Sequence, residues 1–347
     1  MNFYTRQHRY YCGIDLHAKT MYVCVQNQAG EVLASKNLPA APAEFLEVIA
    51  PYREDIVVAV ECLFLWYWLA DLCANENIPL ALGHALYMRA IHGAKAKNDR
   101  IDAHKITSLL RGGLLPLSYV YPAGMRATRD LLRRRNHFTR KRAELIAHIH
   151  NTVSQYNLPP LEGNPRFKKH RAAIPAHFPD PQVRAIIELD LALINHYDEL
   201  LTKLELQLVQ SAKIHDPHMF HLLKTIPGVG PILSLVLLYE IHDISRFPSV
   251  QDFLSYCRLV KCAKESGGKR FGVSGGKIGN AHLKWAFSEA ATLFLRGNPA
   301  GMSLIERLRR KHGKAKAKGI LAAKIGRAVY FMLRRKEAFD INKLTVA

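Results

Sequence analysis

The chain has 347 residues, 49% of them hydrophobic, which favours a folded protein with two or more domains. Its 49 Lys and Arg outnumber its 29 Asp and Glu, and the net charge of +20 indicates a polyanionic partner, most often nucleic acid. It contains no apolar run of about 18 residues, so we expect no membrane span, and the N-terminus lacks the apolar core of a signal peptide. Six cysteines without a C-x-x-C pair indicate reduced thiols in a cytoplasmic protein.

The positive charge is concentrated in the later part of the chain. Residues 1–100 contain 9 Lys and Arg and 10 Asp and Glu, whereas residues 101–347 contain 40 and 19. A near-neutral first domain therefore precedes a strongly basic remainder. This division fits one part that holds metal and another that holds phosphates.

The first hundred residues have the pattern of an α/β sheet. A turn signal at 28–30 makes the first three predicted strands an antiparallel meander. Three strands, a helix and then alternating strands and helices describe a ribonuclease-H-like fold. Strands are predicted at 10–16, 21–26, 31–36, 56–61 and 79–82, and helices at 42–50, 66–75 and 99–112.

Four carboxylates in this region can converge on one point. Asp15 lies inside the first strand, Glu61 ends the fourth, and Asp99 and Asp102 begin the helix at 99–112. Helical positions i and i+3 share a face about 5–6 Å apart, and two carboxylates facing one point repel each other unless a cation lies between them. Hard oxygen ligands suit magnesium. The alternatives are solvent-facing acids at strand ends, an N-cap at Asp99 and a solvated Asp102.

A helical region follows the predicted sheet. The pattern is helical from 122 to 156, with many arginines, and again over 183–214, where apolar residues keep a near-heptad spacing. Residues 159–181 contain six prolines and several basic residues, and indicate a linker. The two helices would form an antiparallel coiled pair or a dimer seam, with an ordinary intramolecular bundle as the alternative.

Residues 226–230, Ile-Pro-Gly-Val-Gly, predict a hairpin between two helices. The glycines let the backbone approach a phosphate closely, and the next helix offers its N-terminal amides. The segment resembles the helix-hairpin-helix nucleic-acid module. The alternative is a purely structural helical turn.

Two serines in a glycine- and lysine-rich segment are candidate nucleophiles. Ser266 and Ser274 each precede Gly-Gly-Lys, and nearby cations suit a scissile phosphate. A serine there becomes a nucleophile if its proton is removed and the developing charge is stabilised. Composition alone indicates a flexible phosphate-binding loop in which both serines only form hydrogen bonds.

The motifs together resemble the DEDD transposases of insertion sequences, a family related to the Piv DNA invertase that includes bridge-RNA-guided recombinases. The chain departs from the family pattern at Cys62-Leu63-Phe64, where small residues usually follow the glutamate, and at Asn98 and Lys284. The matching segments are Gly13-Ile14-Asp15, Val60-Glu61, Lys97–Ala103, Ile226–Gly230, Glu265–Gly268 and Gly279-Asn280-x-x-Leu283.

The resemblance implies three domains. These are a RuvC-like (ribonuclease-H-like) α/β catalytic domain at 1–121, a helical coiled-coil region at 122–217 that includes the linker, and a mainly helical C-terminal transposase domain at 218–347. The last would contain the helix-hairpin-helix motif and the serine loop.

The resemblance also implies the roles of particular residues. The metal-binding acids map onto Asp15, Glu61, Asp99 and Asp102, which would bind one or two Mg²⁺ ions. The family's nucleophilic serine maps onto Ser266 rather than onto Ser274. That serine would form a covalent phosphoserine link that allows strands to be exchanged and rejoined.

The implied partners are double-stranded DNA, both element ends and target, and a structured noncoding bridge RNA that chooses the target. A homo-oligomer, dimer or tetramer, is implied as well, in the bacterial cytoplasm and associated with the nucleoid.

Two other functions compete. A RuvC-like, metal-dependent, structure-selective nuclease would use water and need no serine, and a nucleic-acid-binding protein could carry a decayed site. The Ser-Gly motif argues against the nuclease, and the four acids argue against the decayed site.

Overall fold

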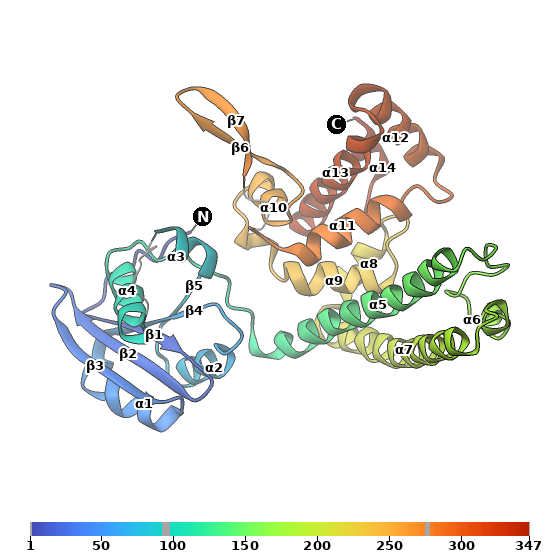
Figure 1. Ribbon diagram of the computed structural model, residues 1–347. Helices are drawn as coiled ribbons and strands as arrows, with labels where there is room; N and C mark the ends of the chain where they lie inside the picture. The colour runs from blue at the N-terminus through green and yellow to red at the C-terminus, as the bar shows by residue number, and fades with distance from the viewer. Residues whose placement is uncertain (1, 92–97, 275–277, 347) are drawn as a thin grey trace. The chain divides into compact units, whose positions relative to one another are not determined.

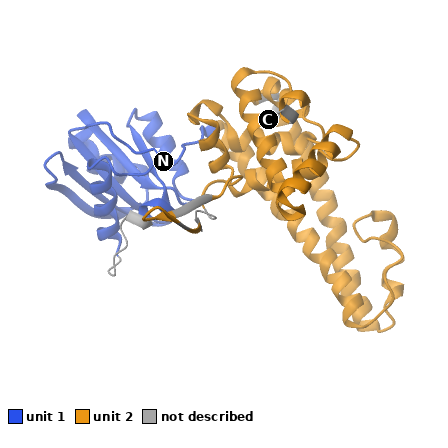
Figure 2. Cartoon of the chain, turned by 90° about the horizontal axis from the view of Figure 1, so that it is seen from above, with its two compact units in different colours: residues 1–123 blue, residues 124–347 orange. Residues whose placement is uncertain are grey.

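The computed structural model describes residues 2–91, 98–274 and 278–346 (Figure 1). The chain divides into two compact units, unit 1 with residues 1–123 and unit 2 with residues 124–347 (Figure 2). The predicted first domain ends close to this division, and the regions predicted as the second and third domains lie in one unit. None of the helices within the described ranges has the length and apolar character needed to cross a membrane.

Unit 1 contains a five-stranded sheet in the order β3–β2–β1–β4–β5. The first three strands form the predicted antiparallel meander, and β4 and β5 join in parallel. The strands are β1 (Tyr10–Leu16), β2 (Thr20–Asn27), β3 (Val32–Pro39), β4 (Ile56–Glu61) and β5 (Leu80–Gly83). The helices are α1 (Pro42–Ile49), the 3-10 turn η1 (Ala50–Asp55), α2 (Tyr67–Asn75), α3 (Ala85–Ile91) and α4 (Asp99–Arg111).

Alternation along the strands gives the sheet two different faces. The even-numbered residues of β1 pack in a core with α1 and α2, whereas Tyr11 packs in a second core with Ile106 and Leu110 of α4. Asp15 is an odd-numbered residue of β1, as Tyr11 is, and therefore points to the same face of the sheet. Glu61 is likewise an odd-numbered residue of β4, as are Val57 and Ala59, which pack in the core with α4. Both predicted acids of the sheet therefore lie on the α4 face.

Gly13 of β1 allows α4 to lie directly on the sheet. A Cβ atom at this position would lie 2.4 Å from Oγ1 of Thr107 and 2.7 Å from the carbonyl oxygen of Ala103. The Thr107 hydroxyl donates to that same carbonyl at 2.8 Å. Because a real Cβ atom does not come this close, a glycine fixes the position of α4 relative to β1.

We expect Gly13→Ala to lower the free energy of unfolding of unit 1 by about 1–3 kcal/mol, because α4 must move off the strand to make room for the methyl group. Chemical denaturation followed by circular dichroism measures this loss. Gly124→Ala, in α5 of unit 2, is the control for the substitution itself, since a Cβ there meets nothing within 4 Å and unit 1 should unfold as in the wild type. Wild-type stability of unit 1 in Gly13→Ala would show that α4 shifts without cost.

Unit 2 is mainly helical and contains one β-hairpin. The hairpin consists of β6 (Cys262–Ser266) and β7 (Lys269–Ser274), and it lies where composition alone indicates a flexible loop. The helices are α5 (Ala123–Gln155), α6 (Lys168–Arg171), η2 (Pro175–His177), α7 (Pro181–His215), α8 (Pro217–Lys224), α9 (Pro231–Ile241), η3 (Ile244–Arg246), α10 (Val250–Tyr256), α11 (Ala281–Leu293), α12 (Pro299–His312), α13 (Lys314–Arg335) and α14 (Ile341–Val346).

The long helices α5 and α7 pair in antiparallel fashion. Arg135 forms an ion pair with Glu205 at 2.6 Å, and His148, further along α5, contacts Asp190, earlier in α7, also at 2.6 Å. The predicted heptad positions of α7 are thus used inside the chain. Its buried residues include Ile187, Leu191, Ile194, Leu201 and Leu208.

The segment 159–181, predicted as a linker, packs against this helix pair. Ile174 and Phe178 are buried in a core with residues of α5 and α7. The guanidinium of Arg171 donates to the carbonyl oxygens of Pro165 and Arg166 at 2.8 and 3.0 Å. Composition wrongly predicted a linker here, because two buried apolar side chains are enough to order a segment rich in proline and basic residues.

Candidate functional site

Three side chains meet where β1 ends and α4 begins. Nε2 of His17 lies 3.4 Å from Oδ2 of Asp15 and 3.4 Å from Oδ1 of Asp99. One potential ligand atom from each residue lies within 4.8 Å of the other two. The side chain of Asp15 is largely buried, whereas those of His17 and Asp99 are half exposed. Carboxylate oxygens and an imidazole nitrogen are donors that a divalent cation accepts, so these residues fit such an ion.

Glu61 and Asp102 flank this cluster on neighbouring elements. Ile14 of β1 pairs with Val60 of β4, so Asp15 and Glu61 follow at the same level of adjacent strands. Oδ1 of Asp102 accepts a hydrogen bond from Nζ of Lys105 at 3.2 Å. The structure therefore brings Asp15 and Asp99 together, places Glu61 beside them on the sheet and holds Asp102 in an ion pair one turn along α4.

The start of α4 keeps Asp99 available for other contacts. Asn98 is the N-cap, and its Oδ1 accepts a hydrogen bond from the backbone N–H of Ile101 at 2.8 Å. The alternative in which Asp99 caps the helix is therefore wrong. The carboxylate of Asp99, in the first turn of the helix, instead faces His17.

Sequence reasoning missed His17. The chain turns back at this residue, whose backbone N–H donates to the carbonyl oxygen of Thr20 at 2.9 Å. Residues two apart along a strand point to the same side, so His17 follows Asp15 onto the α4 face. The Asp-x-His spacing at the end of a strand was the available signal.

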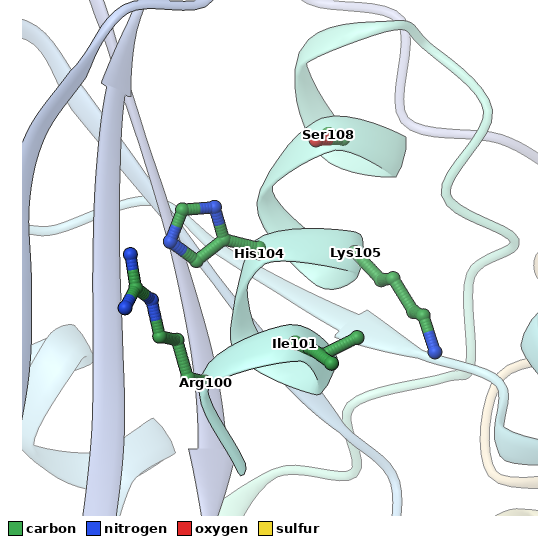
Figure 3. Close-up of a pocket in the computed structure, with 5 residues that line it drawn as sticks. All are labelled: Arg100, Ile101, His104, Lys105 and Ser108. Atoms are coloured by element: carbon green, nitrogen blue, oxygen red, sulfur yellow. The ribbon is translucent and has the colours of Figure 1, made fainter. Parts of the chain in front are cut away.

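The outer side of α4 carries a pocket beside the acids, lined by Arg100, Ile101, His104, Lys105 and Ser108 (Figure 3). Figure 3 shows Arg100 and His104 close together on one side of the helix and Lys105 on the other. Burial, and secondarily the charge of Arg100, lowers the pKa of His104. The lowered pKa favours the neutral imidazole, and the cations at the pocket are Arg100 and Lys105, the second of which is paired with Asp102.

Ser266 lies at the tip of the β6–β7 hairpin, which projects from the helices of unit 2 (Figure 1). It pairs with Lys269 across the turn Gly267-Gly268, whose φ angles are +56° and +72°. Two positive φ angles are typical of the two-residue turns that close hairpins. Ser266 is exposed, and no hydrogen bond of its hydroxyl occurs within the described parts of the chain. Ser274 ends β7, and its side chain lies outside the described residues.

A buried ion-pair network joins α5, α9 and the start of α11. The carboxylate of Glu240 in α9 accepts hydrogen bonds from Nε of Arg129 at 3.0 Å, Nε of Arg133 at 2.7 Å and Nδ2 of Asn280 at 2.8 Å. Asn280 in turn caps α11 by accepting the backbone N–H of Leu283 at 3.1 Å. These two arginines of α5 therefore serve the interior of unit 2.

The network lowers the pKa of Glu240 although the residue is only 1% exposed. Burial alone would raise this pKa, but the hydrogen bond from Arg133, the charges of Arg129 and Arg133 and the hydrogen bond from Asn280 outweigh burial. The pKa falls from its ordinary value of 4.5 to about 2.

We expect unit 2 to lose stability as the pH falls from 4.5 towards 2. A carboxyl group with a lowered folded-state pKa stabilises the fold above its unfolded pKa, and this contribution disappears as the folded form is protonated. Glu240→Gln should lower the free energy of unfolding at pH 7 by about 3–5 kcal/mol, because the buried Arg129 and the partly exposed Arg133 lose their anion. Thermal melts between pH 2 and pH 7 measure both effects. Glu144→Gln, in an exposed pair with Lys141, is the control and should change little. A Glu240→Gln melt identical to that of the control would contradict the role of the network.

The predicted turn at 226–230 joins α8 and α9. Gly228 has a φ of +79°, and a Cβ there would lie 2.5 Å from the carbonyl carbon of Leu293 in α11. Packing against α11 thus explains this glycine. A Cβ at Gly230, the N-cap of α9, would meet nothing within 4 Å. Binding of nucleic acid by this helix pair stays a prediction. Packing does not explain Gly230, so a close approach of phosphate to the backbone is predicted at that residue.

The sheet with acids on β1, β4 and α4, followed by a basic helical unit, is compatible with a RuvC-like DEDD domain joined to a helical partner. Two family models match the chain. A transposase model of the DEDD type of IS110 elements matches residues 12–158, and the model described as the transposase IS116/IS110/IS902 family matches residues 220–306. The chain belongs to this family of DEDD insertion-sequence transposases, whose members are enzymes that act on DNA and use divalent metal.

Curated relatives agree with this membership. The transposase for insertion sequence element IS1111A of Coxiella burnetii is 22% identical over 94% of this chain and 90% of its own length. The transposase for insertion sequence element IS1328 of Yersinia enterocolitica is 23% identical over 82% of this chain and 83% of its own length. An IS110 uncharacterized 43.6 kDa protein of Streptomyces coelicolor is 30% identical over 35% of this chain and 30% of its own length.

Proposed function

We propose that the protein cuts and rejoins DNA strands at the ends of an insertion sequence and at its target. In this proposal the chemistry uses a carboxylate metal site in unit 1 and the serine Ser266 in unit 2, which can come from different copies of the chain. A structured noncoding bridge RNA selects the target. The observation that carries the proposal is the meeting of Asp15 and Asp99 between β1 and α4. A carboxylate pair brought together by a strand and a helix is a site for divalent metal in an enzyme that acts on phosphodiesters.

Asp15, Glu61, Asp99 and Asp102 would hold one or two Mg²⁺ ions. Such ions neutralise phosphate charge and activate an oxygen nucleophile when bound. The protein's own contribution is a fixed distance between the sheet, whose strands β1 and β4 carry Asp15 and Glu61, and α4, which carries Asp99 and Asp102. The close contact of Gly13 with α4 supports this role, since it sets that distance without any ligand.

The serine step is a transesterification. The Oγ–H bond of Ser266 breaks, its oxygen bonds to phosphorus, one P–O ester bond of the DNA breaks, and the proton ends on the leaving oxygen. The phosphoserine ester conserves the ester bond, so a second strand's hydroxyl can reverse the step and rejoin DNA. Lys269, exposed and paired with Ser266 across the turn, suits the negative charge that develops on the phosphate.

The proposed partners are DNA, the bridge RNA and further copies of the chain, as a dimer or tetramer. The basic C-terminal part supports binding of both nucleic acids. α7 supports self-association, because Ile186, Leu189 and Leu193 are 49%, 68% and 49% exposed at spacing i, i+3, i+7. These residues lie outside the buried heptad positions of the same helix. We expect the protein to act in the cytoplasm, on the nucleoid.

A reconstituted reaction tests the proposal. The full chain is mixed with Mg²⁺, a labelled duplex spanning an element end, a target duplex and RNA transcribed from the noncoding flank of the gene. We expect strand-exchange products and a covalent protein–DNA adduct, both lost when metal or RNA is omitted. Exchange without RNA would refute guidance. Cleavage that never yields an adduct would favour the RuvC-like nuclease that uses water.

A further inference from the structure

The two most exposed large hydrophobic side chains of the described chain are both phenylalanines. Phe64 is 83% exposed and Phe271 is 70% exposed. Phe64 lies three residues after Glu61 in unit 1, and Phe271 lies five residues after Ser266 in unit 2. Each ring therefore lies within five residues, along the chain, of a residue that we assign to the chemistry of its own unit.

The loop after β4 does not need Phe64 for packing. The chain turns directly after Glu61, where the backbone N–H of Leu63 donates to the carbonyl oxygen of Glu61 at 2.8 Å. Trp66, two residues after Phe64, is only 5% exposed and fixes the loop to the core.

Phe271 occupies a β-bulge. Glu265 pairs with Arg270 and Lys264 pairs with Gly272, so Phe271 is the extra residue between two ladder positions. Bulges redirect a side chain and are frequent near active sites. A hairpin of two strands has no second layer of its own that could cover the ring.

We propose that Phe64 and Phe271 each stack on an unpaired DNA base that is bound at the ring's own unit, and so hold the neighbouring phosphate away from the duplex stack. The inference rests on the proposed function, because it takes Glu61 and Ser266 as reacting groups. Aromatic rings stack on any base, and apolar wedges unstack base steps. Such contacts ignore sequence, which suits an enzyme whose target is chosen by RNA pairing.

Charge and isolation favour DNA over a protein as the occupant of the hairpin. Residues 261–271 contain five charged residues. Four are positive, at positions 261, 264, 269 and 270, and one is negative, at position 265. Phe271 is the single aromatic residue in that run. A protein interface needs a contiguous apolar patch of at least several hundred Å², whereas one ring among cations matches a base flanked by phosphates.

The experiment measures base unstacking directly. Full-length protein is bound, with Ca²⁺ replacing Mg²⁺, to a duplex spanning the element end that carries 2-aminopurine at successive positions near the cut. We expect the fluorescence to rise at a base beside the scissile phosphate. Phe64→Ala and Phe271→Ala should each abolish the fluorescence rise at the base on which the missing ring stacks. Each should also weaken binding of this duplex roughly 5- to 150-fold. The Trp variants should retain both properties.

Further variants separate stacking from other roles. Phe167→Ala is the matched control, because Phe167 is also an exposed phenylalanine of unit 2, at 54%, outside the hairpin. It should leave fluorescence and affinity unchanged. Phe271→Leu keeps apolar surface without a ring, and it should behave like the alanine variant. Thermal melts should be unchanged for all of these, since the rings pack against nothing essential.

Two results would overturn the inference. One is wild-type fluorescence in both alanine variants. The other is intact unstacking together with lost self-association by mass photometry, which would make the rings contacts between copies. Ser266→Ala keeps the two inferences apart, because it should lose the adduct and retain the fluorescence rise. A wild-type protein that unstacks DNA but never forms an adduct refutes the nucleophile and supports the stacking role.

Discussion

Ser266→Ala is expected to remove the covalent protein–DNA adduct and strand rejoining. The rates of both should fall by a factor on the order of 10⁶, as the catalytic rate does when other serine nucleophiles are removed. No neighbouring hydroxyl can replace that of Ser266, because Glu265 precedes it, Gly267 follows it and Lys269 of β7 pairs with it. The measurement is a denaturing gel of labelled element-end DNA after reaction with Mg²⁺ and the RNA.

Two observations accompany this experiment. Ser274→Ala, at the other end of β7, should reduce the adduct only slightly. Metal binding by Ser266→Ala, measured by calorimetry, should equal that of the wild type, because the acids belong to unit 1. An adduct that persists in Ser266→Ala and disappears in Ser274→Ala would reverse the assignment of the nucleophile.

Asp15→Asn and Asp102→Asn are each expected to abolish strand cleavage while the protein stays folded and binds DNA. An amide keeps the shape of the side chain but removes the negative charge that attracts a divalent cation. Asp15 sits with Asp99 and His17, so removing one charge relieves repulsion between the two carboxylates, and the melting temperature should stay equal or rise.

Asp102→Asn differs from Asp15→Asn in its expected stability. Asp102 forms an ion pair with Lys105, and breaking a partly exposed pair of this kind costs about 0–1 kcal/mol. Glu47→Gln on the exposed face of α1 is the control for both variants and should cut DNA normally. Full cleavage by Asp102→Asn would remove that residue from the site.

Local patterns predicted most of unit 1. Continuous β-branched residues in β4 and the turn signal between β2 and β3 identify strands without knowledge of the fold, and every predicted element of this unit is present. The helix α3 was missed because it has only seven residues and is preceded by His84, which is not a residue preferred at the N-cap. The presence of Asp99 on the first turn of α4 was predictable, and its contact with His17 was not, since that contact depends on how α4 crosses the sheet.

The sequence was less informative for unit 2, because its key contacts join residues far apart in the chain. Nothing local indicates that Arg129 and Arg133 neutralise Glu240, more than a hundred residues later. The hairpin was hidden by a composition typical of loops. Its Gly267-Gly268 pair was nevertheless an available signal, because two glycines between short strands favour a tight turn.

The Gly267-Gly268 turn also limits which mutations the gene can accumulate. Both residues have positive φ angles, and a Cβ at either position would meet no neighbour, so backbone conformation alone requires glycine there. A single base change converts a glycine codon to Ala, Val, Asp, Glu, Arg, Ser, Cys or Trp. Of these only Asp tolerates this conformation, and Asn, the other residue that does, requires two changes. Random point mutation of the element therefore damages the position of Ser266 through its neighbours as readily as through its own codon.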